Sequence, residues 1–141
     1  MGLHLELNVL RNASDLSAGT VSPMTRLEVI ECMPLNAQLT NVVARGKRAG
    51  WGSPQVTPQL CPRGFNLQQL THDDHTYTFG VDFYGEPLTW LYASDFDKVA
   101  LSGYEENCEP IDFLAYHPGA IAALAYIKAL PSDTPVVLYW T

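Results

Sequence analysis

TYTFGVDFYGEPLTWLYA, residues 76 to 93, is the stretch from which the fold is predicted. Its first half alternates side chains with the period of two that a half-buried strand requires. Gly85, Glu86 and Pro87 break the run, and a second alternating strand follows from Leu88 to Tyr92. The pattern predicts an antiparallel β-hairpin that the rest of the chain covers or extends. The side chains predicted to share one face of the first strand are Tyr77, Phe79, Val81 and Phe83.

Strands and helices are expected on both sides of this hairpin. Alternation predicts an opening strand over 3–9 and a second strand over 25–32, although residues 24–33 also fit a helix. Helical spacing of apolar residues predicts one helix over 34–45 and another over 118–130. Residues 136–140 are apolar on both faces, so this final strand is predicted to be central in the sheet.

Three segments complete the predicted architecture. Residues 65–70 fit either a short strand or a helical turn, while Ser94 is a candidate N-cap of a short helix that Gly103 would end. Glycine and proline punctuate 46–64 as a long loop of the kind that is often functional. The sequence therefore predicts a single α+β domain over 1–141. We expect a mixed or antiparallel sheet of about five strands around the central hairpin 76–93, with two to three helices mainly on one face.

The composition limits the class of protein. The chain has 141 residues, of which 47% are hydrophobic and 16% charged, enough to bury a core and too few charges for disorder. Cys32, Cys61 and Cys108 are odd in number and far apart, which argues against a disulfide framework and favours a reducing, cytoplasmic location. His4 and Glu6 interrupt the first apolar run, so no signal peptide is predicted. No window approaches the about 20 apolar residues of a membrane span.

The net charge of −7 is unevenly divided along the chain. Residues 1–71 carry four acids against six bases, a net of +2, and residues 72–141 carry eleven acids against two bases, a net of −9. Such an acidic half repels nucleic acid and favours a basic protein partner, although acids also serve simply to keep a protein in solution. The two-signed distribution also suits a homodimeric contact.

Aromatic and acidic side chains gather in the acidic half, which is what a surface offers to a basic partner. The predicted partner-binding residues are Tyr92, Asp95, Asp97, Tyr104, Glu105, Glu106 and Glu109. A small acidic domain without a catalytic motif has the physical type of an inhibitor of a nucleic-acid-acting enzyme. We therefore predict a non-enzymatic bacterial or phage protein of the immunity or counter-defence type, which binds and inhibits a basic protein without a cofactor.

A metal-dependent hydrolase is the alternative hypothesis. His72, Asp74 and His75 lie within four residues, and imidazole and carboxylate are ordinary ligands for zinc and iron. Cys61 or His117 would support such a site. The structural interpretation of the same residues is a polar turn whose aspartates accept backbone hydrogen bonds.

Overall fold

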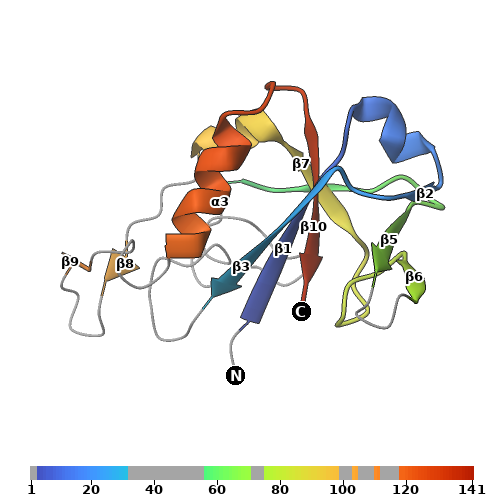
Figure 1. The fold of residues 1–141 in the computed structure, drawn as a ribbon, viewed down its shortest axis with the longest axis horizontal. Coiled ribbons are helices and arrows are strands. Elements are labelled where there is room, and N and C mark those ends of the chain that lie inside the picture. Colours follow the sequence, from blue (N-terminus) through green and yellow to red (C-terminus); the bar gives the residue numbers. More distant parts are fainter. Residues whose placement is uncertain (1–2, 32–55, 71–74, 99–102, 105–109, 112–117) are drawn as a thin grey trace.

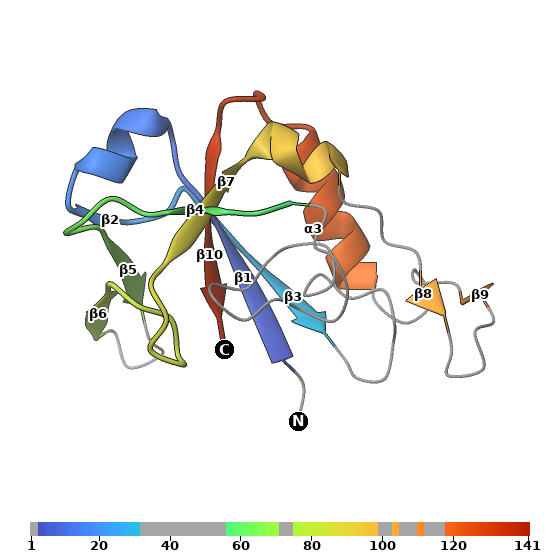
Figure 2. The ribbon, with the colours of Figure 1, turned by 180° about the vertical axis from the view of Figure 1, so that it is seen from behind.

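The structure of the protein, a computed structural model, describes residues 3–31, 56–70, 75–98, 103–104, 110–111 and 118–141. Figures 1 and 2 show these residues arranged in layers around a five-stranded sheet. Helices cover one face of this sheet, and a smaller three-stranded sheet lies against the other. The predicted α+β class and the sheet of about five strands are therefore confirmed.

The five-stranded sheet is antiparallel throughout, with the strand order β3-β1-β10-β7-β4. Its strands are β3 (Thr25–Glu31), β1 (Leu3–Val9), β10 (Pro135–Trp140), β7 (Thr89–Tyr92) and β4 (Gln59–Leu60). Every residue of β10 is buried, as a strand covered on both faces must be. The central position predicted for this strand is confirmed.

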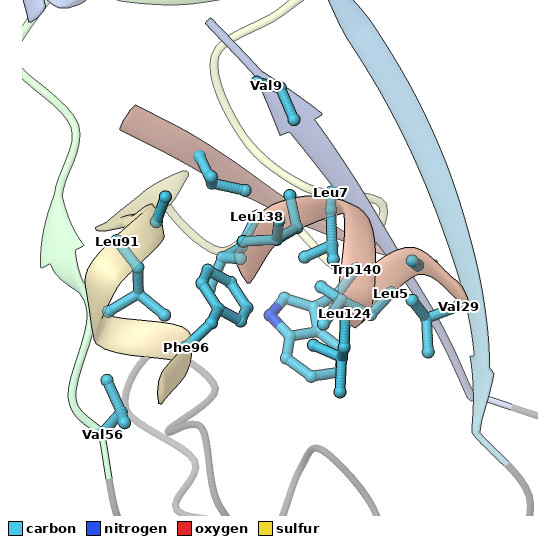
Figure 3. Packing of buried hydrophobic residues seen from close by; sticks show 14 residues of the cluster. Leu5, Leu7, Val9, Val29, Val56, Leu91, Phe96, Leu124, Leu138 and Trp140 are labelled. Atoms are coloured by element: carbon cyan, nitrogen blue, oxygen red, sulfur yellow. The ribbon is translucent and has the colours of Figure 1, made fainter. Parts of the chain in front are cut away.

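One face of the sheet packs against α3 (Pro118–Lys128) and the 3-10 helix η2 (Ala93–Lys98). Leu5, Leu7 and Val9 of β1 project to this face, because alternate residues of a strand share a side. Figure 3 shows them in one cluster with the rings of Phe96 and Trp140. Small residues such as Ala123 on α3 let the helix approach the sheet closely.

The other face packs against the small sheet, which has the strand order β2-β5-β6. Its strands are β2 (Thr20–Val21), β5 (Asn66–Leu70) and β6 (Thr76–Phe79), and the 3-10 helix η1 (Ala13–Ser17) precedes it. Segment 65–70 is thus a strand. Two further short strands, β8 (Gly103–Tyr104) and β9 (Pro110–Ile111), pair beyond α3, at the opposite end of the molecule from β6 (Figure 1).

The central hairpin predicted over 76–93 is wrong. Its two strands belong to different sheets, since β6 pairs with β5 while β7 lies between β10 and β4. Three of the four residues of β7 are buried, so this strand needs the interior of a covered sheet, whereas Tyr77 and Thr78 on β6 are exposed. A single bridge between Val81 and Pro87 is all that remains of the pairing.

The helices differ from the prediction as well. The described residues contain one α-helix and two 3-10 helices, and η2 begins at Ala93, so the predicted N-cap Ser94 lies within it. Helix α3 and η2 share one face of the sheet, as predicted, while Leu16 of η1 joins the cluster on the other face. The helix predicted over 34–45 lies outside the described residues, as do Cys32 and Cys108.

Candidate protein-binding surface

Residues 81–87 form a tight loop, named here the aromatic loop, that connects the two sheets. Its backbone is fixed by the buried carboxylate of Asp82, whose Oδ1 accepts hydrogen bonds from the N–H groups of Tyr84 at 2.8 Å and Glu86 at 3.0 Å. Gly85 donates its N–H to the Asp82 carbonyl at 3.0 Å, which closes a β-turn. Gly85 has a φ of 81°, a value that favours glycine.

A further hydrogen bond ties this loop to the core of the protein. The N–H of Phe83 donates to the carbonyl of Trp140 at 3.1 Å, at the end of the central strand β10. The N–H of Asp82 donates to the carbonyl of Glu86 at 2.8 Å across the loop. The aromatic loop is therefore a rigid projection of the sheet.

Large apolar side chains are exposed on this loop and on the strand before it. Phe83 is 72% exposed, the highest value for a large hydrophobic residue within the described ranges. Tyr77 is 50% exposed, and Val81 and Tyr84 are each 45% exposed. The single strand face predicted for Tyr77, Phe79, Val81 and Phe83 is therefore wrong, because β6 ends at Phe79 and Val81 and Phe83 lie in the loop. Only Phe79 of that set is half-buried.

A series of aromatic contacts connects β6 with the main sheet. The ring of Tyr77 lies 6.5 Å from that of Phe79, and Phe79 meets the buried ring of Tyr139 at 5.7 Å in an edge-on geometry. Such edge-to-face pairs stabilise beyond their buried area, by about 0.5–1.5 kcal/mol. They hold the small sheet, and with it one end of the aromatic loop, against β10.

A polar cluster lies beside these rings, at the seam between the two sheets. Glu6 on β1 accepts a hydrogen bond at 3.1 Å from Gln69 on β5 and forms an ion pair at 3.1 Å with the Nε of Arg26 on β3. The guanidinium of Arg26 also donates to the Gln68 carbonyl of β5 at 3.1 Å. Burial raises the pKa of Glu6, while the Arg26 charge opposes that rise. These contacts hold β5 of the small sheet against β1 and β3 of the large sheet.

The pKa of Glu6 has a testable consequence for stability. Because its pKa in the folded protein exceeds the ordinary 4.5, the folded state binds a proton more tightly than the unfolded state. We therefore expect the unfolding free energy of the wild type, minus that of Glu6→Gln, to fall as pH rises above 4.5. Urea unfolding of both proteins at a series of pH values measures this difference. A difference that rises with pH would contradict the burial of the carboxylate.

Those predicted partner-binding residues that the structure describes lie apart from the aromatic loop. Tyr92 ends β7, and its ring packs edge-on against Trp90 at 4.8 Å. Asp95 and Asp97 lie on η2, beside α3, whereas the loop precedes β7 at its opposite end (Figure 1). Tyr104 belongs to β8, beyond α3 (Figure 1). Glu105, Glu106 and Glu109 lie outside the described residues.

Asp95 has a structural contact of its own. Its Oδ2 accepts the N–H of Tyr92 at 2.9 Å, where the strand turns into η2. We expect Asp95→Ala to reduce the free energy of unfolding by about 1 kcal/mol, because the N–H of Tyr92 at the start of the helix loses its acceptor, as in one half of a capping box. Asp97→Ala is the matched control, since Asp97 is an exposed acid on the same helix, and it should change stability by less than about 0.5 kcal/mol. Equal effects in a thermal melt would contradict the capping role.

The residues of the alternative metal site are only partly described. His72 and Asp74 lie outside the described residues, as does His117, and His75 is exposed with its ring 6.5 Å from that of Tyr77. Within the described ranges, no group of three or more His, Cys, Asp or Glu side chains could hold a metal ion. Burial raises the pKa of Cys61 to about 12, so this thiol stays protonated and is unsuited to act as a nucleophile.

The period of two did not predict the exposure of Phe83, although the sequence contains a signal for it. Asp82 and Gly85 are spaced as the first and fourth residues of a type I turn, a position pair that these residue types favour. In such a turn Phe83 and Tyr84 occupy the tip, where their side chains project outward. The period of two along 76–84 obscured this local signal.

Comparisons with models of protein families, with curated proteins and with solved structures found no match for this chain. Among the described helices, none has both the length and the apolar character needed to cross a membrane. The function therefore has to be argued from the chain's own residues.

Proposed function

We propose that this protein is a non-enzymatic binding protein that recognises and inhibits a basic protein partner. The observation that carries this proposal is a rigid, exposed aromatic segment within an acidic part of the chain. Phe83 and Tyr84 are exposed, and the sequence contains no lysine or arginine between Arg63 and Lys98.

Two physical effects support a protein as the partner. Exposed aromatic side chains contribute most of their binding energy when a partner removes them from water, and they are enriched among the residues that dominate interfaces. The net charge of −9 over residues 72–141 attracts a cationic surface and raises the rate of encounter with it. The same charge repels polyanions, so nucleic acid is disfavoured as the direct ligand.

Inhibition follows from where basic clefts occur. Enzymes that act on nucleic acid line their clefts with lysine and arginine, and an acidic domain that fills such a cleft competes with the substrate. Asp95, Asp97, Glu105, Glu106 and Glu109 are the acids we assign to this complementarity, with Tyr92 and Tyr104 as additional anchors. The reducing environment suggested by the three separated cysteines suits a cytoplasmic site of action.

Affinity capture tests the proposal. The tagged protein is incubated with lysate of the cells that produce it, at low and at high salt, and retained proteins are identified by mass spectrometry. We expect one basic protein to be retained at low salt and to be weakened by added salt, because salt screens charges that lie at the rim of an interface. Retention of no protein, or of an acidic protein insensitive to salt, would contradict the proposal.

A further inference from the structure

The aromatic loop differs from the other exposed aromatic sites in what its side chains already contact. Tyr92 packs on Trp90, and the hydroxyl of Tyr126 on α3 hydrogen-bonds with Oγ1 of Thr25 at 2.8 Å. Phe83 meets the ring of Tyr84 edge-on at 5.5 Å and remains 72% exposed.

The loop is already in one conformation before any partner arrives. Its turn is closed by the Gly85 N–H, the Asp82 carboxylate accepts two further backbone N–H groups, and Phe83 is bonded to the end of β10. Ordering a flexible loop on binding opposes association, at about 0.5–1.5 kcal/mol for each immobilised side chain. A preorganised loop avoids part of this loss, which is the property expected of an interface anchor.

The charge around the loop indicates the chemistry of the partner. Glu86, which is half-buried, lies within the loop itself, while Asp95 and Asp97 lie at the other end of β7, and the sequence has no lysine or arginine between Arg63 and Lys98. A second copy of this chain would bring a like charge of −7 and the same acidic segment against it. A basic protein with an apolar pocket would suit both the aromatic tip and the carboxylate of Glu86, and the net charge of −9 over residues 72–141 would attract it.

We infer that the aromatic loop is the anchor of the interface, with Phe83 entering an apolar pocket of the partner that is bordered by lysine or arginine. This inference rests on the proposed function and adds the site of contact to it. It places the centre of the interface on residues 81–87 instead of on Tyr92 and Tyr104. Asp95 and Asp97, at the far end of β7, then attract the partner through long-range charge.

Photochemical cross-linking locates the contact while the partner is still unidentified. Phe83 is replaced by p-benzoylphenylalanine in the full chain, which is expressed in the cells that produce the protein and irradiated. Tyr126 on α3, replaced in the same way, is the matched control, because it is an exposed aromatic residue on the opposite layer. We expect position 83 to cross-link to one basic protein and position 126 to give no such product.

The partner identified by cross-linking is then purified, and its affinity for the wild type and for variants of the loop is measured. We expect Phe83→Ala to weaken binding by about 30-fold or more, the fold-change that corresponds to a dominant interface residue. Leu60→Ala is the control, since Leu60 on β4 is also an exposed apolar residue, 68% accessible, and it should change the affinity by less than about twofold. The exposure of Phe83 means that its truncation leaves the core intact, which circular dichroism verifies.

Asp82 acts as a positioning residue, because it holds the loop backbone and does not itself contact the partner. Its variants therefore test how much the fixed conformation of the loop contributes to binding affinity. Asp82→Ala removes the acceptor of two backbone N–H groups and should weaken binding by about tenfold, whereas Asp82→Asn keeps an acceptor oxygen and should restore most of it. If the fixed conformation of the loop did not matter for binding, Asp82→Ala and Asp82→Asn would bind the partner with equal affinity.

The outcomes distinguish this inference from the proposed function. If the wild type captures a basic protein that binds Phe83→Ala as tightly as the wild type, the anchor is refuted and the proposed function stands. If position 83 cross-links to a second copy of the chain, or to an acidic protein, the stated partner chemistry is refuted. If no protein is captured or cross-linked at either position, both proposals fail.

Discussion

Truncation of Trp140 to alanine is expected to lower the free energy of unfolding by about 3–5 kcal/mol. Trp140 is only 2% exposed and ends the central strand β10, where its ring shares a cluster with Phe96 and Leu124 (Figure 3). Its removal leaves a cavity that the sheet and α3 can fill only by moving closer together. Since domains of this kind are stable by about 5–15 kcal/mol, this one change removes a large part of the total.

Urea unfolding followed by far-ultraviolet circular dichroism measures the effect. Leu60→Ala is the matched control, because the Leu60 side chain is exposed and its truncation opens no cavity, so a change below about 0.5 kcal/mol is expected. If Trp140→Ala lost less than about 1 kcal/mol, the packing of η2 and α3 against β10 would be refuted.

Charge reversal in the acidic half should have the second large effect, on association rather than on folding. The triple variant Glu105→Lys, Glu106→Lys, Glu109→Lys changes the net charge by six units. We expect it to slow association with the captured basic partner by about 100-fold at low salt, within the range that electrostatic steering provides. Stopped-flow association kinetics at several salt concentrations measure the rate.

The corresponding glutamine variant serves as the control for charge reversal. It removes three negative charges without adding positive ones, so its association rate should lie between those of the wild type and the lysine variant. At high salt, where the charges are screened, the association rates of both variants should approach that of the wild type. An unchanged association rate in the lysine variant would show that these three residues do not contribute to association with the partner.

Local patterns in the sequence predicted the strands of this fold better than their pairing. Alternation correctly predicted β1 and β3, and the two apolar faces of residues 136–140 correctly predicted a central strand. These signals depend only on which faces of a strand are buried. The hairpin over 76–93 failed because pairing depends on distant segments, with β6 adding to β5 and β7 adding to β10.

The candidate site was harder to predict for the same reason. The spacing of Asp82 and Gly85 predicts a turn with Phe83 at its tip. Whether another part of the chain covers that tip depends on which sheet packs beside it, and residues 76–93 alone do not determine that. The polar contacts among Glu6, Arg26 and Gln69 join three strands that are far apart in the sequence. The overall acidity of residues 72–141 was readable from the sequence, and it remains the basis on which the chemistry of the partner is inferred.

Competition with DNA shows whether this protein occupies the basic cleft of its partner and displaces a polyanion from it. A fluorescent DNA duplex is bound to the captured partner at low salt, and the protein is titrated in while anisotropy is followed. The acidic, aromatic surface predicts full displacement at one equivalent of protein per partner, and weaker displacement by Phe83→Ala. Binding of the protein with the DNA still in place, or no effect on the DNA at any ratio, would contradict the account.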